Sequence, residues 1–527
     1  MAKHIVVCMD GTWNDPTEQT NVYKLFRLLE GDERRVAEAG AIRPHLRKEG
    51  AGLLGLYVEG VGARGRHQGP LGGALGVGLH DRVIDAFVLV SQAYAPGDRL
   101  WVFGFSRGAW AARSLAGFIA RAGLLDDAGR ADAAVRAETL WFEFKHGKLG
   151  DRGDHYWQGR DPQPIELVGV WDTVGALGVP FFNGLRVVDG LEARLFEFAD
   201  LDLSPRVKHG RHALAIDETR FDFSPTPWNA RAGVVQTWMP GVHGDVGGGH
   251  ERAGLSDDAL QWMVGEINGL GAGLELATTR LKDDFRPDAL ADRHDEARKL
   301  VWQLRPRKPR QIPVDAQLAP AVAARLRGRA DYRPAALRPH PACTAFFADA
   351  APPPAERLVP VKEALPTRRL PVGDSDSSVV FAQKWWNAAG LEVKAGERYR
   401  ITAAGTWTDR DNSADARGYS STNFMMRFAE SSRRLESALW FALIAAVNED
   451  VALELKNPTS GNFVTGGMES FVRGVGRVDA ASQLQATGLL CELTADRDGF
   501  LYFFANDSAF AYSNNSGYLD VTASRLA

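Results

Sequence analysis

Three residue types that together can make an alcohol nucleophilic occur in one order along the chain. Ser106 is the middle residue of Gly104-Phe-Ser-Arg-Gly108, and Asp172 and His243 follow it. A serine hydroxyl is a weak nucleophile until a base takes its proton, and histidine, which titrates near neutrality, can take and return that proton. A carboxylate fixes the imidazole tautomer and stabilises the imidazolium. The three residues therefore predict attack of a serine oxygen on an acyl group.

Other residues compete for the two supporting roles. His209, His212 and His250 are alternative bases. His212 falls within a predicted strand, which favours a packing role, whereas His250 has polar neighbours and is expected to be solvated. Asp217 and Asp245 are alternative acids, and Asp245 could instead orient its glycine-rich loop or bind a cation.

Each of the three candidates follows a short apolar run of the kind found in buried parallel strands. The runs are residues 100–103, 165–171 and 234–238. Further strands are predicted at 4–9, 52–58 and 211–216, and helices at 21–29, 80–94, 109–120 and 131–146. Alternating strands and helices predict a parallel sheet covered on both faces, with its site at the carboxyl ends of the strands. The predicted fold class is α/β, a doubly wound and mostly parallel sheet of the α/β-hydrolase kind, since that fold has the order Ser, Asp, His.

Backbone N–H groups near Ser106 could bind the oxyanion that such an attack creates. The N–H of Arg107 lies at the start of the predicted helix, and the Gly11–Thr12 turn follows the first strand. Alternatively, this turn is an ordinary strand end that Asp10 caps. The glycine-rich stretch at 60–78 lacks the phosphate-loop pattern, which favours a mobile loop over a pocket.

The composition is that of a globular protein of more than one domain. The chain has 527 residues, 45% of them hydrophobic and 24% charged, and a net charge of −4. This charge gives no reason to expect a nucleic-acid partner, and the basic run at 305–310 is interpreted as a solvated loop. The three cysteines are far apart, which excludes a disulfide framework and suits a reducing compartment. Because no apolar run fits a signal peptide or a bilayer span, we expect synthesis in the cytoplasm without a signal peptide and, for any action outside the cell, a non-classical route.

Residues 104–109, 170–175 and 240–249, together with 10–14 and 59–62, resemble the catalytic domain of type VI secretion phospholipase effectors. The resemblance covers roughly residues 1–345. It implies an α/β-hydrolase that cleaves acyl esters of phospholipids at a lipid or membrane surface, with Ser106 as nucleophile, Asp172 as acid and His243 as base. It also implies delivery by the type VI route and a partner in the secretion apparatus. Gly244 stands where Ser or Ala is expected.

The composition changes after residue 345. A proline-rich linker is predicted at 346–372, and short strand-like segments with turn signals between them predict a β-sandwich at 373–527. Residues 403–409, 496–499 and 506–517 resemble the calcium-dependent galactophilic bacterial lectin family. That resemblance implies a Ca²⁺ ion and a glycan partner, the ion being held by Asp507, Asn514 and Asn515 with backbone carbonyls of Ala511 and Asp409.

The favoured hypothesis is a two-domain lipolytic enzyme that needs no cofactor for catalysis and docks on a surface through its second domain. Two alternatives stay open. One is a soluble carboxylesterase acting on small or polymeric esters, and the other is a carbohydrate-binding adhesin whose hydrolase domain is inactive.

Overall fold

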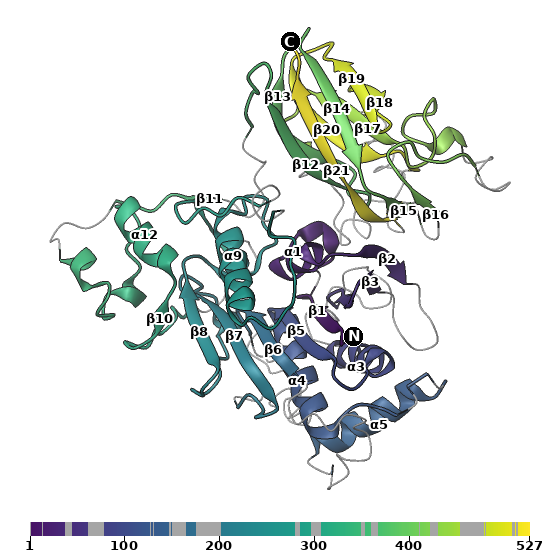
Figure 1. Cartoon of the computed structure of the whole chain (residues 1–527). Coiled ribbons are helices and arrows are strands. Elements are labelled where there is room, and N and C mark those ends of the chain that lie inside the picture. Colours follow the sequence, from purple (N-terminus) through teal and green to yellow (C-terminus); the bar gives the residue numbers. More distant parts are fainter. Residues whose placement is uncertain are drawn as a thin grey trace, which may run out of the picture. The chain divides into compact units, whose positions relative to one another are not determined.

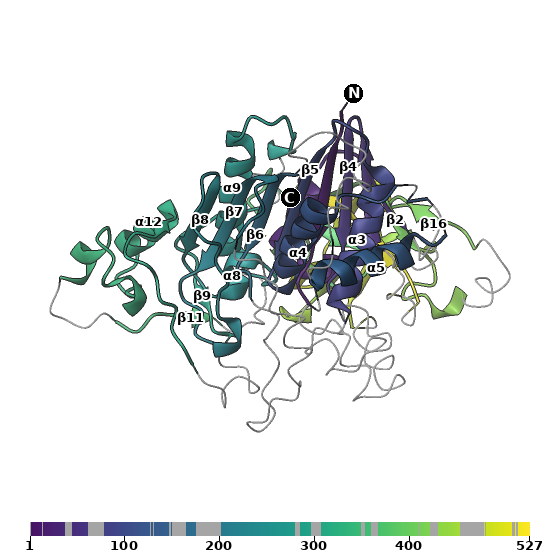
Figure 2. The same cartoon turned by 90° about the horizontal axis from the view of Figure 1, so that it is seen from below.

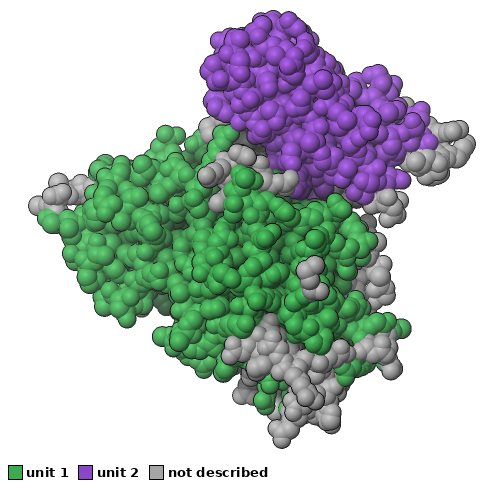
Figure 3. Space-filling model, in the orientation of Figure 1, with its two compact units in different colours: residues 1–361 green, residues 362–527 purple. Residues whose placement is uncertain are grey.

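The structure, a computed structural model, describes most of the chain as two compact units, Met1–Val361 and Lys362–Ala527 (Figure 3). The described residues are 2–12, 14–36, 45–61, 78–126, 128–129, 131–146, 149, 165–174, 202–279, 285–296, 307–348, 354–359, 367–409, 412–421, 430–453, 479, 481–508, 512 and 515–527. The predicted loop at 60–78 lies mostly outside them, as do parts of the predicted linker. The linker and the predicted domain boundaries therefore stay predictions.

The first unit is built on a nine-stranded sheet in the order β10-β8-β7-β6-β5-β1-β4-β3-β2. The seven strands from β10 to β4 pair in parallel, and β3 and β2 pair antiparallel. Their bounds are β1 His4–Met9, β2 Asp32–Val36, β3 His45–Gly50, β4 Leu53–Val58, β5 Arg99–Phe105, β6 Ile165–Trp171, β7 Val207–Ala215, β8 Val234–Met239 and β10 Gln317–Leu318. Every residue of β6 is buried, as expected of a central parallel strand covered on both faces.

Helices cover both faces of this sheet (Figures 1 and 2). On one face, α3 (Leu79–Ala93) and α4 (Arg107–Ala122) pack on the alternate β1 residues Ile5, Val7 and Met9, and α5 (Ala133–Lys145) packs on α3 and α4. On the other, α1 (Asn21–Leu28) packs against α9 (Gly254–Gly269). Two glycines of the sheet face these helices, since a Cβ at Gly55 would meet Phe26 of α1 and one at Gly169 would meet Met263 of α9. The predicted α/β fold class, a mostly parallel sheet covered by helices on both faces, is confirmed for the first unit.

The β2–β3 hairpin at one end of the sheet was not predicted. The β2 sequence Asp-Glu-Arg-Arg-Val is almost entirely charged and lacks an apolar face. Charged residues on an edge strand oppose further strand pairing. The same charges that protect this edge therefore conceal the strand from an apolar-pattern search.

The remaining described α-helices and strands of the first unit lie beyond β8. They are α8 (His243–Gly247), α12 (Pro320–Gly328) and the parallel pair β9 (Arg293–His294) and β11 (Leu358–Val359). Of all described helices, none combines the length and apolarity that a bilayer span requires. The three cysteines are free, in keeping with their spacing.

The second unit is β-rich, with two antiparallel sheets. One has the order β16-β15-β21-β14-β19, with β12 also on β21, and the other has the order β13-β20-β17-β18. Tyr399, Trp407, Leu391 and Phe503 come from both sheets and share one buried core. The strands are β12 Ser375–Phe381, β13 Asn387–Val393, β14 Arg398–Ala404, β15 Trp407–Asp409, β16 Asn412–Ala414, β17 Leu443–Asn448, β18 Gln483–Ala486, β19 Leu490–Thr494, β20 Gly499–Ala505 and β21 Asn515–Arg525.

Candidate active site

Ser106 occupies a sharp turn between β5 and α4. Its backbone has φ 58° and ψ −122°, a conformation that L-residues rarely adopt. The two flanking glycines allow the turn, because a Cβ on Gly104 would lie 2.4 Å from the carbonyl oxygen of Gly108, and one on Gly108 would lie 2.3 Å from that of Met9. The predicted strand, tight turn and helix are thus confirmed, and they present the hydroxyl at a helix N-terminus, where N–H groups lack intrahelical partners.

One imidazole connects Ser106 with Asp172. The His243 Nε2 lies 2.8 Å from Ser106 Oγ, and its Nδ1 lies 2.7 Å from Asp172 Oδ2. Asp172 directly follows β6, and Ser106 follows the neighbouring β5. Residues far apart in the chain therefore meet because parallel strands end at one edge of the sheet.

The ring of His243 is held between two aromatic side chains. Phe105 lies 4.6 Å from it between centroids, and Phe223 meets it edge-on at 4.8 Å. His243 was expected in a loop, but it begins the short helix α8. A Cβ at Gly247 in this helix would lie 1.9 Å from the Phe105 ring. The missing side chain at Gly247 therefore lets α8 approach the end of β5 closely.

Arg310 binds the carboxylate of Asp172 with two nitrogens. Nη1 lies 3.1 Å from Oδ1 and Nη2 lies 2.9 Å from Oδ2, and the N–H of Ala215 also donates to Oδ1 at 3.0 Å. Burial alone would raise the pKa of Asp172, but Arg310 and His243 outweigh it and hold that pKa well below its usual range. The interpretation of residues 305–310 as a solvated loop was wrong for Arg310, which is buried. Its position in a run of basic residues hid this role.

Two of the rival residues have other partners. His212 is fully buried, accepts a hydrogen bond at Nε2 from the N–H of Thr173, and has its pKa lowered by burial to about 3. It is therefore a neutral packing histidine that supports the turn after Asp172. Asp217 accepts hydrogen bonds from the N–H of Gly241 and from the hydroxyl of Tyr332, and burial raises its pKa.

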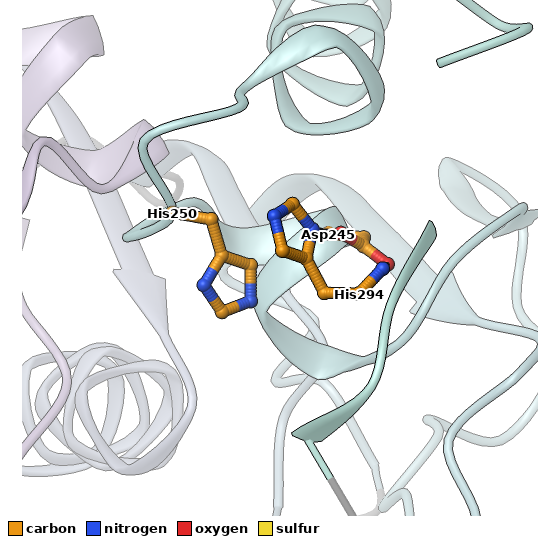
Figure 4. Close-up of side chains that lie close together, drawn as sticks. All are labelled: Asp245, His250 and His294. Carbon is orange, nitrogen blue, oxygen red and sulfur yellow. Dashed lines mark hydrogen bonds and ion pairs between the residues drawn. The ribbon is translucent and has the colours of Figure 1, made fainter. Parts of the chain in front are cut away.

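Asp245, His250 and His294 form a buried cluster close to α8 (Figure 4). Each offers one ligand atom within 4.8 Å of the others, so the cluster is a candidate cation site. The two imidazoles are stacked at 4.0 Å, however, and each is paired with a carboxylate, His294 with Asp245 and His250 with Glu296. An ion binds in the plane of an imidazole, so nitrogens of the stacked His250 and His294 rings can both bind one ion only if the rings turn out of this arrangement. The expectation that His250 is solvated was wrong, because its side chain is only 7% exposed.

The same cluster explains the glycine at position 244. A Cβ there would lie 2.3 Å from His250 Nε2 and 2.4 Å from Glu296 Oε1. The space that a Ser or Ala side chain would need is therefore filled by the His250–Glu296 pair. Asp245 also accepts a hydrogen bond from the N–H of Val242 at 3.0 Å, so it orients the loop, one of its two predicted alternatives.

The turn predicted to bind an oxyanion lies against the start of α4. The carbonyl oxygens of Met9 and Asp10 border Gly108, but the N–H of Gly11 donates to the carboxylate of Asp10 at 2.7 Å. Asp10 also accepts from the hydroxyls of Thr20 and Tyr57, each at 2.6 Å. The Oγ1 of Thr12, by contrast, is buried without a hydrogen-bond partner among the described residues.

The predicted calcium ligands can be located only in part, since Ala511 and Asn514 lie outside the described residues. Asp409 pairs with Asn515 in the antiparallel ladder of β15 and β21. Asp409 accepts a hydrogen bond from the hydroxyl of Tyr419, and Asp507 lies close enough to affect it electrostatically. The pKa of Tyr419 is raised by burial and by these two carboxylates. The Oδ1 of Asn515 is buried and lacks a hydrogen-bond partner among the described residues, while its Nδ2 donates to the carbonyl of Ala382.

Several solved structures resemble the chain distantly. The Tle1 effector bound to the VgrG spike of the type 6 secretion system is 20% identical, with 47% of this chain and 51% of that chain covered and a TM-score of 0.27. An uncharacterized protein from Pseudomonas aeruginosa is 18% identical, with 55% and 49% covered and a TM-score of 0.31. The EclA N-terminal domain, a PllA-like lectin, is 16% identical, with 28% and 94% covered and a TM-score of 0.18.

Sequence comparison is more informative. The uncharacterized protein YEL023C of Saccharomyces cerevisiae is 29% identical over 249 residues, 43% of this chain. The chain spans about a third of that relative, 33% of its length. A family model described as "T6SS, Phospholipase effector Tle1-like, catalytic domain" matches residues 3–266, just over half of the chain. The chain therefore belongs to the family of Tle1-like type VI secretion phospholipase effectors.

Proposed function

We propose that the first unit is a serine hydrolase of the α/β-hydrolase fold that cleaves acyl esters of phospholipids through Ser106. The observation that carries this proposal is the placement of one imidazole 2.8 Å from the Ser106 hydroxyl and 2.7 Å from the Asp172 carboxylate. The parallel sheet, the strained turn at Ser106 and the family match support it.

In the proposed reaction, His243 acts as base and then as acid. With Nδ1–H donating to Asp172, Nε2 accepts the proton of Ser106 while Oγ attacks the acyl carbonyl carbon. The tetrahedral oxyanion is bound by the N–H of Arg107 and by the hydroxyl of Thr12, whose Oγ1 is buried without a partner among the described residues. The N–H of Gly11 takes no part, because it already donates to Asp10. His243 returns the proton to the leaving alcohol, and water then hydrolyses the acyl-Ser106 by the same path in reverse.

Phospholipid as substrate is supported by the family, and Ser106→Ala tests it. Purified wild type should hydrolyse both short acyl esters and phospholipid vesicles, whereas the variant should lose both activities with an unchanged circular dichroism spectrum. Turnover of short esters without release of fatty acid from vesicles favours the soluble carboxylesterase instead. Undiminished hydrolysis by the variant would exclude Ser106 as nucleophile.

We propose further that the second unit is a lectin-like β-sandwich that binds Ca²⁺ and, through it, glycan hydroxyls. The residues present fit the ion, because Asn515 has a buried amide oxygen without a partner among the described residues and two carboxylates lie near it in the fold. Asp507, Asn514 and Asn515 would hold the ion with carbonyls of Ala511 and Asp409. The ion would supply open coordination positions for a diol.

Calcium binding is tested by thermal unfolding with CaCl₂ and with EDTA. Wild type should unfold at a higher temperature with calcium, since a ligand of the native state stabilises it, and Asn515→Ala should abolish the difference. An equal transition in CaCl₂ and EDTA would contradict the calcium proposal. Calcium-dependent glycan binding by a chain that hydrolyses no ester would favour the adhesin.

For delivery, we propose the type VI route, with a component of the secretion apparatus as partner. The family supports this. Co-purification of the chain with a spike protein of the same bacterium tests the proposal, and loss of export in a strain without a functional apparatus is the expected result.

A further inference from the structure

Three charged side chains gather at the start of α8. Glu218 and Arg220 follow β7, and Glu296 follows β9; all three are buried. Buried charges are unfavourable unless they are paired and hydrogen bonded. The contacts that these three side chains make therefore indicate what they do.

The two carboxylates bind the N–H groups at the start of α8. Glu218 Oε2 accepts from the N–H of His243 at 3.2 Å, and Glu296 Oε1 accepts from the N–H of Gly244 at 3.1 Å. The first N–H groups of a helix have no partner within it, and negative charge there is favourable. The carboxylates thus fix the main chain of the residue whose side chain meets Ser106.

Arg220 joins the two carboxylates and the aromatic wall of the site. Its Nη2 lies 2.6 Å from Glu218 Oε2 and pairs with Glu296 as well. The guanidinium also lies 3.7 Å from the ring centroid of Phe223, which packs edge-on against His243. One cation therefore sets the position of both carboxylates and of a ring that confines the imidazole.

We propose that Glu218, Arg220 and Glu296 are positioning residues that hold His243 toward Ser106 through the main chain of α8 and the ring of Phe223. The role in turnover rests on the proposed function, in which His243 is the base. The hold on the main chain does not, because it concerns the backbone N–H groups of His243 and Gly244 and not the reaction.

The test compares Glu296→Gln with Glu356→Gln. Glu356 is a matched control because, like Glu296, it is a carboxylate paired with two side chains, here Arg293 and Arg325, and has no contact with α8 among its recorded partners. The readouts are hydrogen–deuterium exchange of the peptide that contains His243 and Gly244, followed by mass spectrometry, and kcat and KM for a short acyl ester. Circular dichroism confirms folding, and Glu218→Gln replaces Glu296→Gln if that variant does not fold.

Glu296→Gln and Glu218→Gln should each speed exchange of the amide hydrogen that the carboxylate binds, by about fivefold or more, because a neutral amide oxygen accepts a hydrogen bond more weakly than a carboxylate. For the short ester, kcat should fall with little change in KM. Glu356→Gln should change neither readout. Unchanged amide exchange and unchanged kcat in a folded Glu296→Gln or Glu218→Gln protein would overturn the inference. If wild type cleaves no ester, the proposed function fails, while amide exchange still decides whether the carboxylates hold the main chain of α8.

Discussion

Asp10 and Asp172 are both buried carboxylates at the carboxyl ends of parallel strands of one sheet, but their partners differ in charge. Asp172 accepts hydrogen bonds from the guanidinium of Arg310 and from an imidazole. Asp10 accepts only from two hydroxyls and one backbone N–H among its recorded partners.

This difference sets opposite pKa shifts. Burial outweighs the neutral donors and raises the pKa of Asp10 to about 7, whereas the positive charge of Arg310 keeps that of Asp172 well below its usual range. Neutral hydrogen bonds thus hold a buried carboxyl group in place, but a full positive charge is what keeps it ionised. A residue that must orient an imidazolium needs the second kind of environment.

The largest effect is expected from Asp172→Asn. In the proposed mechanism an amide can no longer select the imidazole tautomer or stabilise the imidazolium, so kcat should fall by about 10⁴-fold, as it does in a serine protease. Steady-state hydrolysis of a short ester measures this. Asp217→Asn, at the rival carboxylate, is the control and should retain activity; equal losses in both variants would remove the distinction between the two aspartates.

Next in size is the effect of Arg310→Met on stability. The folded-state pKa of Asp172 is depressed, so its contribution is present above the unfolded-state value and is lost as the pH falls below that value. Without Arg310 the buried carboxylate is uncompensated, and the free energy of unfolding at pH 7 should fall by about 3–5 kcal/mol. Urea unfolding measures this. Arg231→Met is the control. Among its recorded partners Arg231 donates only to backbone carbonyl oxygens, so its loss should lower the free energy of unfolding by less.

A smaller effect of opposite sign is expected at Asp10. Because its folded-state pKa is raised, the native state binds more protons than the unfolded chain between about pH 4 and 7, and the free energy of unfolding should fall as the pH rises through this window. Asp10→Asn should remove this fall, which amounts to about 4 kcal/mol at most. Urea unfolding at several pH values tests it, and a slope equal to that of wild type would show that Asp10 is ionised throughout.

The parts that could be predicted from the sequence follow local rules. Apolar runs located the central parallel strands, and the strand-end rule placed Ser106, Asp172 and His243 at one edge of the sheet. Glycine spacing predicted the sharp turn at Ser106, because the two glycines make contacts that a Cβ would prevent.

The parts that escaped prediction depend on distant pairing. Arg310 belongs to a basic run whose composition suggests solvent, and only the fold brings it to Asp172. Glu218 and Glu296 likewise carry no local signal, since their partners are backbone N–H groups of a helix that the sequence presents as a glycine-rich loop. Where burial of a charge is decided by a partner far along the chain, local composition predicts the wrong environment.

The central claim is that His243 makes Ser106 a nucleophile. Reaction of the full chain with a fluorophosphonate, followed by mass spectrometry of the intact protein and its peptides, tests this most directly. The account predicts a single adduct on Ser106 that forms rapidly in wild type and is nearly absent in His243→Ala. An unmodified Ser106, or an adduct that forms equally fast without His243, would contradict it.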